Sequence, residues 1–142
     1  MIERYFEAYP GVRAYLDDTV VQAKEQGFAE TMFGRKRHVP ELKAANATQR
    51  GFGERTAMNH PMQGSAADII KLAMTEVQRR IMERGLKAKL LLQVHDELDF
   101  SVRADEVDEL SGIVKDIMEH VVELRVPLDV DVSAGENWAE AH

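Results

Sequence analysis

Residues 89–100, KLLLQVHDELDF, place a polar triplet between two short apolar runs. Each run has the length and composition of a β-strand, and His95–Glu97 stand where a tight turn would reverse the chain. A hairpin of this kind holds a carboxylate at its apex. An Asp in a turn more often serves the turn itself, because its side chain bonds nearby backbone groups. The His and the second acid beside Asp96 keep a chemical role open.

The composition predicts one soluble, globular domain. The chain has 142 residues, of which 44% are apolar and 30% charged, and no apolar run is long enough to span a membrane. There is no cysteine, so any metal must bind carboxylate, His or backbone oxygen. Together with a start, MIER, that is unlike a signal peptide, this fits a cytoplasmic protein.

The charge is distributed unevenly along the chain. The net charge is −7, yet residues 35–55 contain six basic residues against two acidic ones. From residue 86 to the end there are five basic residues and fourteen acidic ones. This asymmetry suggests a basic strip that faces a polyanion and an acidic remainder that faces water or metal. Charge alone leaves equally open that both regions are ordinary solvated surfaces.

Periodicity and turn signals predict a mixed fold. The predicted elements are helices over 2–8, 11–26, 46–59, 65–84 and 105–121, hairpins over 28–39 and 89–102, and a last strand over 128–135. Pro61 should break or kink the helical path, and Asp105 should cap the last long helix. This order predicts an α/β fold of the mixed α+β kind, in which an antiparallel sheet carries helices on one face.

One row of polar side chains indicates contact with a duplex. Arg55, Asn59 and Gln63 follow each other at intervals of four, so on a continuous helix they share one face with donors about 6 Å apart. Such a row matches the acceptors that every base pair presents in the minor groove, and it would sense duplex shape without reading sequence. On spacing alone, a solvated helix face is the better supported interpretation, and a kink at Pro61 would weaken the alignment.

The acidic apex allows a sharper hypothesis. Asp96 offers a hard oxygen ligand of the kind that Mg²⁺ takes together with substrate phosphates. In-line phosphoryl transfer by two metal ions about 4 Å apart requires at least two converging carboxylates. Asp96 and Glu97 would point to opposite faces in strand-like backbone, and no other acid has an equally informative context. A second metal-bridging Asp is missing.

Four segments together resemble bacterial family A DNA polymerases. They are QVHDEL (93–98), ERTAMNHPMQGSAADIIKLAM (54–74), TMFGRKRHVPEL (31–42) and VPLDVDVSAGENWAEAH (126–142). The resemblance implies the end of the fingers subdomain in residues 1–45 and the C-terminal part of the palm subdomain in residues 46–142. Two earlier family segments, one with the first metal-binding Asp and one with the nucleotide-binding fingers helix, have no counterpart in this sequence. We therefore expect a fragment that is inactive by itself.

The resemblance also assigns roles to single residues. Asp96 is similar to the second catalytic Asp, a Mg²⁺ ligand, Glu97 to its supporting acidic neighbour, and His95 to a residue beside the primer terminus. DNA-binding roles fall on Arg50, Arg55, Asn59 and Gln63. For Arg50 the implied partner is the template strand, although the family often has two adjacent basic residues where this chain has Gln49 and Arg50.

The implied activity is that of a DNA-directed DNA polymerase of replication and repair. It transfers a nucleotide from a deoxynucleoside triphosphate to the 3′-hydroxyl of a primer paired with template DNA, with two Mg²⁺ ions. In this chain alone we expect metal binding to be weak or absent. We expect no membrane partner, and self-association through an exposed sheet edge or apolar surface. A stand-alone nucleic-acid-binding module and an inert structural fragment remain the alternatives.

Overall fold

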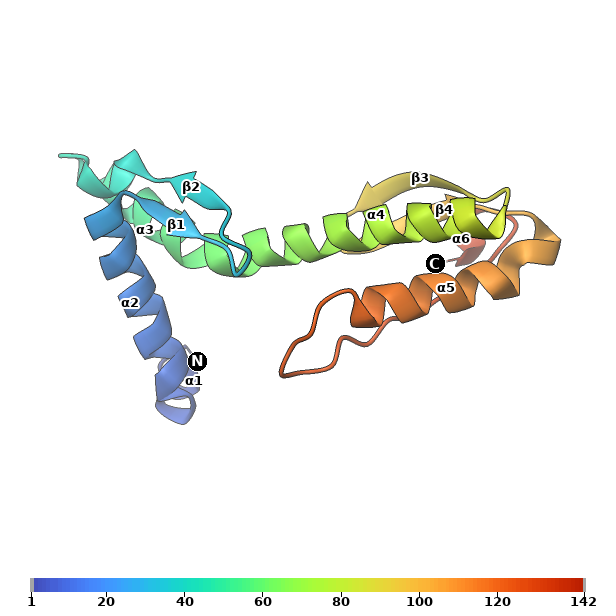
Figure 1. Ribbon diagram of the computed structural model, residues 1–142. Helices are drawn as coiled ribbons and strands as arrows, with labels where there is room; N and C mark the ends of the chain where they lie inside the picture. Colours follow the sequence, from blue (N-terminus) through green and yellow to red (C-terminus); the bar gives the residue numbers. More distant parts are fainter. Residues whose placement is uncertain (1, 142) are drawn as a thin grey trace. The chain divides into compact units, whose positions relative to one another are not determined.

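The chain folds into two compact units in the computed structural model, which describes residues 2–141 (Figure 1). By packing, the units are Met1–Ala66 and Ala67–His142, and each is described by itself. The boundary predicted between residues 45 and 46 separates the fingers and palm subdomains, which are not defined by packing within this chain. It stays a prediction.

The first unit consists of helices around a short hairpin. Its elements are α1 Ile2–Ala8, α2 Pro10–Gln26, β1 Phe28–Glu30, β2 Lys36–His38, a 3₁₀ helix Pro40–Lys43, α3 Ala47–Asn59 and a π-helical segment His60–Gly64. Pro10 stands in the first turn of α2, where its missing N–H removes no helical hydrogen bond. Gly27 ends α2 with φ 84°, a left-handed conformation that glycine adopts without strain. The predicted helices and hairpin of this half are confirmed.

Small side chains let the parts of the first unit approach closely. The buried apolar core consists of Ala23, Ala29, Val39, Leu42 and Ala57. At Gly53, a Cβ atom would lie 2.8 Å from the backbone nitrogen of Leu42, so only glycine allows α3 to pack directly on the 3₁₀ helix. Glycine lowers helix propensity, but at position 53 it allows the close contact between α3 and the 3₁₀ helix.

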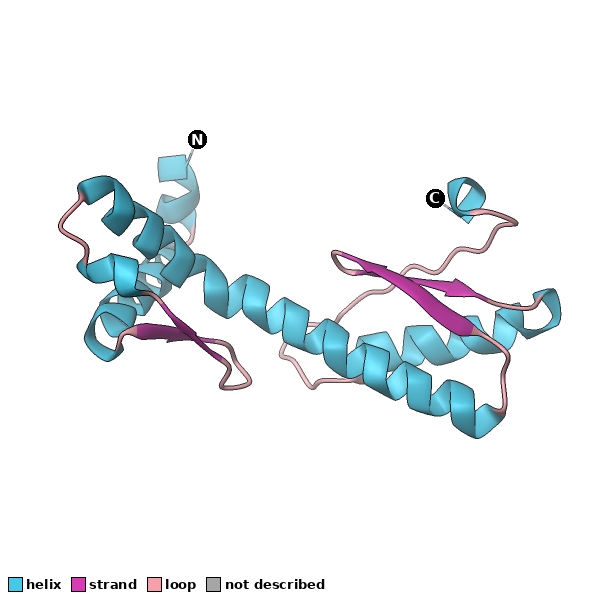
Figure 2. Cartoon of the chain, turned by 90° about the horizontal axis from the view of Figure 1, so that it is seen from above, coloured by secondary structure: helices cyan, strands magenta, loops and turns pink. Residues whose placement is uncertain are grey.

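The second unit combines long helices with a β-hairpin. Its elements are α4 Ser65–Arg84, whose first residues belong to the first unit, β3 Lys89–Val94, β4 Glu97–Ser101, a 3₁₀ helix Ala104–Glu106, α5 Val107–His120 and α6 Trp138–Ala141. Strands β3 and β4 are antiparallel, with Val94 opposite Glu97 and Leu90 opposite Phe100. Figure 2 shows this hairpin beside α4 and α5, and the extended chain after α5 returning past it to α6.

The core of the second unit forms between α4 and α5. Its buried side chains are Ala73, Val77, Ile81, Ala88, Leu110, Val114 and Ile117. On each helix these residues recur at intervals of three or four, as expected for an apolar stripe. Phe100 and Val102 at the end of the hairpin pack against the same cluster and attach the strands to the helices. A mixed fold with antiparallel strands and packed helices is therefore confirmed.

Two details of the sequence prediction are wrong, and a third holds in part. Residues 128–135 form no strand, although their polar and apolar residues alternate. Pro61 interrupts the regular α-helix, which stops at Asn59 and resumes at Ser65, but the π-helical segment between them continues the helical path, and a kink there stays a prediction. Asp105 does not cap α5, because its carboxylate accepts hydrogen bonds of 2.9 and 3.0 Å from Arg103 instead.

None of the helices within residues 2–141 combines the length and the apolar character that crossing a lipid bilayer requires.

Candidate nucleic-acid interface

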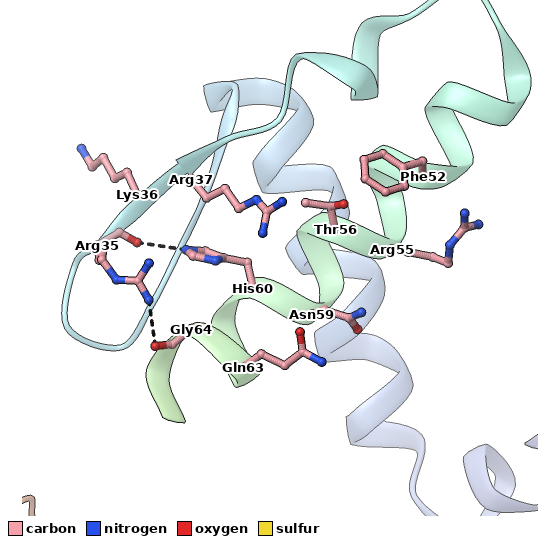
Figure 3. Close-up of a pocket in the computed structure, with 10 residues that line it drawn as sticks. All are labelled: Arg35, Lys36, Arg37, Phe52, Arg55, Thr56, Asn59, His60, Gln63 and Gly64. Carbon is pink, nitrogen blue, oxygen red and sulfur yellow. Dashed lines mark hydrogen bonds between the residues drawn. The ribbon is translucent and has the colours of Figure 1, made fainter. Parts of the chain in front are cut away.

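A pocket of about 590 Å³ opens in the first unit, between the β1–β2 hairpin and the helix that follows it (Figure 3). Its lining residues are Arg35, Lys36, Arg37, Phe52, Arg55, Thr56, Asn59, His60, Gln63 and Gly64, and we name them together the basic pocket. Four of these side chains are cationic, and none of the lining residues is a carboxylate. A concave surface of one charge sign concentrates ions of the opposite sign, so the chemistry of the pocket suits a polyanion.

The predicted row of donors lies in this pocket. Arg55 and Asn59 belong to α3 and Gln63 to the π-helical segment, and all three line the same cavity. The structure therefore brings together the side chains that the spacing placed on one face, and Pro61 does not separate them. Neutral amide donors beside guanidinium groups can bond both phosphate oxygens and the acceptors of base edges.

Hydrogen bonds fasten the tip of the hairpin to the π-helical segment. The Nη2 of Arg35 donates to the carbonyl oxygen of Gly64 at 3.0 Å, and the Nε2 of His60 lies 3.3 Å from the carbonyl oxygen of Arg35. The backbone N–H of Met32 donates to the Oγ of Ser65 at 2.9 Å, and that hydroxyl donates to the carbonyl oxygen of Pro61. The two walls of the basic pocket are thus held by bonds and not only by apolar packing.

Gly64 is required by the closeness of these two walls. A Cβ at this position would lie 2.7 Å from the Cγ2 of Thr31 and 3.0 Å from the Cε1 of His60. The hydroxyl of buried Thr31 accepts from the backbone N–H groups of Phe33 and Arg35, which holds the threonine in place. Glycine is therefore the residue that fits at this contact.

Acidic and basic groups around α3 are arranged so that positive charge stays in the pocket. Glu54 precedes Arg55 in sequence, but it pairs with Lys24 of α2 at 2.8 Å and does not line the cavity. Arg50 does not line it either. Its Nη1 donates to the carbonyl oxygens of Ala44 and Ala45 at 2.9 and 2.6 Å, which ties down the loop before α3. A template contact by Arg50 stays a prediction.

Part of this site was not predicted from the sequence. Phe52, Thr56 and His60 line the pocket but were not singled out. Helical spacing could have identified Phe52, which stands three residues before Arg55 on α3. No local sequence pattern predicts that His60 lines the pocket, because its position beside the hairpin depends on how the hairpin folds back on the helix.

The acidic apex of the second unit is a tight turn, as predicted. His95 and Asp96 connect β3 and β4, and His95 has φ 53°, a left-handed conformation that is uncommon for a residue with a side chain. Two-residue hairpin turns need such a residue, because a positive φ matches the twist of the strands. The Nε2 of Gln93 donates to the carbonyl oxygen of His95 and supports the turn. His95, Asp96 and Glu97 are all exposed.

The apex has the chemistry of a single metal ligand, and its role in metal binding stays a prediction. The exposed carboxylate of Asp96 offers oxygen ligands that suit a divalent cation such as Mg²⁺. Among the described residues, however, no three His, Asp or Glu side chains converge closely enough to hold a metal ion. Asp96 therefore fits as one ligand of a cation whose other ligands come from water, from substrate or from other protein segments.

The Oδ2 of Asp99 in β4 is buried without a hydrogen-bond partner in the described structure.

Comparisons with known proteins give a consistent result. A family model described as DNA polymerase family A matches residues 1–140. The chain is 50% identical over 140 residues to DNA polymerase I of Lactococcus lactis, and 49% identical over 140 residues to DNA polymerase I of Bacillus subtilis. Each alignment covers 99% of this chain but 16% of the relative, so the chain spans about a sixth of the length of these proteins.

A solved structure has the same fold. It is the POL domain of Pol1 from M. smegmatis, in complex with DNA primer-template and dNTP. The similarity has a TM-score of 0.95 at 47% sequence identity, and it covers 99% of this chain and 25% of that chain.

Proposed function

Because this chain belongs to DNA polymerase family A, we propose that it forms part of a template-directed DNA polymerase and carries that enzyme's contact with primer–template DNA. The observation that carries the proposal is the basic pocket, in which Arg55, Asn59 and Gln63 face one cavity among four cationic side chains. The solved relative binds primer-template and dNTP, and these are the ligands that such a surface suits. The proposal includes residues 1–45 as the end of the fingers, residues 46–142 as part of the palm, and a cytoplasmic location.

The reaction proposed for the complete enzyme is nucleotidyl transfer. The primer 3′-hydroxyl gives its proton to water as its oxygen forms a bond to the α-phosphorus of a deoxynucleoside triphosphate. The bond from this phosphorus to the oxygen that bridges to the β-phosphorus breaks, and pyrophosphate leaves with the electron pair. In this chain Asp96 would hold Mg²⁺, Glu97 would support it, and His95 would lie beside the primer terminus. The bound cation would supply positive charge to the phosphate oxygens.

The contribution of the basic pocket is positioning. Cationic side chains attract the phosphates of either strand, and this attraction is independent of base sequence. Asn59 and Gln63 add neutral donors that fit base-edge acceptors common to all correctly paired duplexes. A duplex held in this way presents its primer end in one orientation, and correct orientation of the reacting groups lowers the barrier of a two-substrate reaction.

Duplex binding by the isolated chain tests the proposal. Fluorescence anisotropy with a labelled primer–template should show salt-dependent binding, and Arg55→Ala should weaken it and lower the slope of log affinity against log salt by about 1. Gln63→Ala should weaken binding about 5-fold, the equivalent of about 1 kcal/mol for one hydrogen bond, without changing that slope. Arg13→Ala is the matched control, because Arg13 pairs with Asp17 at 2.8 Å and does not line the pocket.

Two outcomes would contradict the proposal. One is a chain that binds no duplex at any ionic strength, and the other is equal loss of binding in Arg13→Ala and Arg55→Ala. Primer extension separates the parts of the proposal, since the isolated chain should bind duplex but should not extend it. In a longer polymerase that carries this sequence, Asp96→Ala should lower turnover by orders of magnitude with little change in DNA affinity.

A further inference from the structure

One residue of the basic pocket differs in chemistry from the others. Phe52 is an aromatic side chain with 50% of its surface exposed, and it lines the cavity together with cationic and amide groups. Figure 3 shows its ring on α3 close to Thr56, with the side chain of Arg55 directed away from it. A single exposed apolar side chain is common on protein surfaces, so exposure by itself decides nothing. The combination of a free ring with surrounding cations is what requires an explanation.

Phe52 has no evident role in holding the fold together. It is absent from the buried core of the first unit, whose members are small aliphatic residues between α2, the hairpin and α3. Two half-buried rings of this unit lie beside cations, with Arg13 5.3 Å from the ring centre of Phe6 and Lys36 4.5 Å from that of Phe28. Within the described part of the chain, Phe52 takes part in no such contact and in no ring–ring pair. Its ring is available to a ligand.

The position of the ring along the helix relates it to the row of donors. Phe52 precedes Arg55, the first donor of the row, by three residues, so it lies about 4.5 Å nearer the N-terminus of α3 than that donor. Successive bases of a strand are separated by about 3.4 Å, so this offset is close to one nucleotide step. If Arg55, Asn59 and Gln63 contact successive base pairs of the duplex, the ring of Phe52 lies beside the next nucleotide after those base pairs.

We propose that Phe52 is a stacking platform for an unpaired nucleobase of the template strand. The inference rests on the proposed function, because in a primer–template the unpaired bases that continue the duplex belong to the template. Surfaces that bind single strands combine cations along the backbone with aromatic rings on which bases stack, and the basic pocket contains both. Arg35 and Arg55 contact phosphates in this arrangement, while Phe52 binds the base itself and does so without reading its identity, because every base has a π-face.

Three DNA ligands separate stacking from simple charge attraction. They are a blunt duplex, the same duplex with a template overhang, and the same overhang with abasic sites, which keeps the phosphates but removes the bases. Measured by anisotropy, the chain should bind the normal overhang more tightly than the abasic overhang. Phe52→Ala should abolish this preference, a loss of about 5-fold to 150-fold in affinity for the normal overhang, so that the normal and abasic overhangs bind equally.

Matched variants and a spectroscopic signal complete the test. Phe52→Tyr should retain the preference, because a stacking face remains. Phe33→Ala removes a comparable ring, 42% exposed, that does not line the pocket, and it should behave as wild type. With 2-aminopurine as the first unpaired template base, the wild-type chain should change the fluorescence of this base, and Phe52→Ala should not. Circular dichroism should show both alanine variants folded, since each ring is exposed.

The outcomes distinguish this inference from the proposed function. Equal affinity of the wild-type chain for normal and abasic overhangs, with duplex binding intact, overturns the role of Phe52 and leaves the proposed function standing. Full retention of the preference in Phe52→Ala has the same meaning. A chain that binds none of the three DNAs overturns both.

Discussion

Gly64→Ala is the substitution that tests most directly how the basic pocket is built. The added Cβ would lie 2.7 Å from the Cγ2 of Thr31, where ordinary van der Waals contact begins at 3.4 Å. Thr31 is buried and its hydroxyl accepts two backbone hydrogen bonds, so its methyl group cannot rotate away freely. Forcing one extra carbon into a well-packed site costs about 1–3 kcal/mol, and the backbone here needs no glycine for its dihedral angles.

Two measurements follow from this geometry. In urea denaturation, Gly64→Ala should lower the free energy of unfolding by about 1–3 kcal/mol. Its primer–template affinity should also fall, because moving the hairpin tip breaks the bond from Arg35 to the carbonyl oxygen of Gly64 and displaces one cationic wall of the pocket. Both effects come from the same displacement, so they should appear together.

A second substitution should repair the first one in part. Thr31→Ser removes the methyl group that the new Cβ would strike and keeps the hydroxyl that supports the turn. The double variant should therefore regain part of the lost stability, though not all, because the Cε1 of His60 stays 3.0 Å from the new carbon.

The control for this experiment is Gly112→Ala. Gly112 lies within α5, and a Cβ there would meet nothing within 4 Å, so the change should stabilise the helix by about 0.5–1 kcal/mol. The reasoning is refuted if Gly64→Ala is as stable as wild type, or if Thr31→Ser gives no recovery in its presence.

The remaining predictions concern the second unit. His95→Gly should leave the β3–β4 hairpin as stable as wild type or more so, since His95 has φ 53°, while His95→Ala should gain nothing, and thermal melting of both variants checks this. The hydrogen bond from Arg79 lowers the pKa of Glu76, and Arg80 adds to the effect. Glu76→Gln should therefore be less stable than wild type near neutral pH, and the difference should disappear as the pH falls from about 4.3 through the lowered folded-state value, which urea titrations at several pH values can follow. The isolated chain should self-associate, because β3 has a free edge in the described structure and exposes Leu91 and Leu92 at 59% and 60%, and sedimentation showing only monomer at high micromolar concentration would contradict this.

Local patterns were sufficient for most of the elements. The apolar residues of α4 and α5 recur at helical spacing, and both stripes became the buried core of the second unit. The turn at His95 and Asp96 was visible because a polar pair interrupts two apolar runs. The row Arg55, Asn59 and Gln63 was visible for the same reason, since residues four apart on one helix are neighbours before any tertiary contact forms.

The two wrong predictions concern structures that form only when a second group is available as a hydrogen-bond partner. Alternation over residues 128–135 is compatible with a strand, but a strand exists only when another edge accepts its hydrogen bonds, and within the described structure none pairs with this segment. Asp105 had the chemistry of a helix cap, but Arg103 binds its carboxylate. In both cases the local structure depends on which hydrogen-bond partner is available in the folded chain. The sequence of a single segment does not contain that information.

The sequence by itself thus determined the helices, both hairpin turns and the side chains that could meet a duplex, because these depend on residues close together in the chain. Only the tertiary structure decided that Arg35, Lys36 and Arg37 face Phe52 and Gln63 across one cavity. That arrangement depends on the hairpin folding back onto α3 and the π-helical segment, where a missing Cβ at Gly64 lets the two backbones approach. Contacts between residues about thirty positions apart follow from this packing and from no periodicity in the sequence.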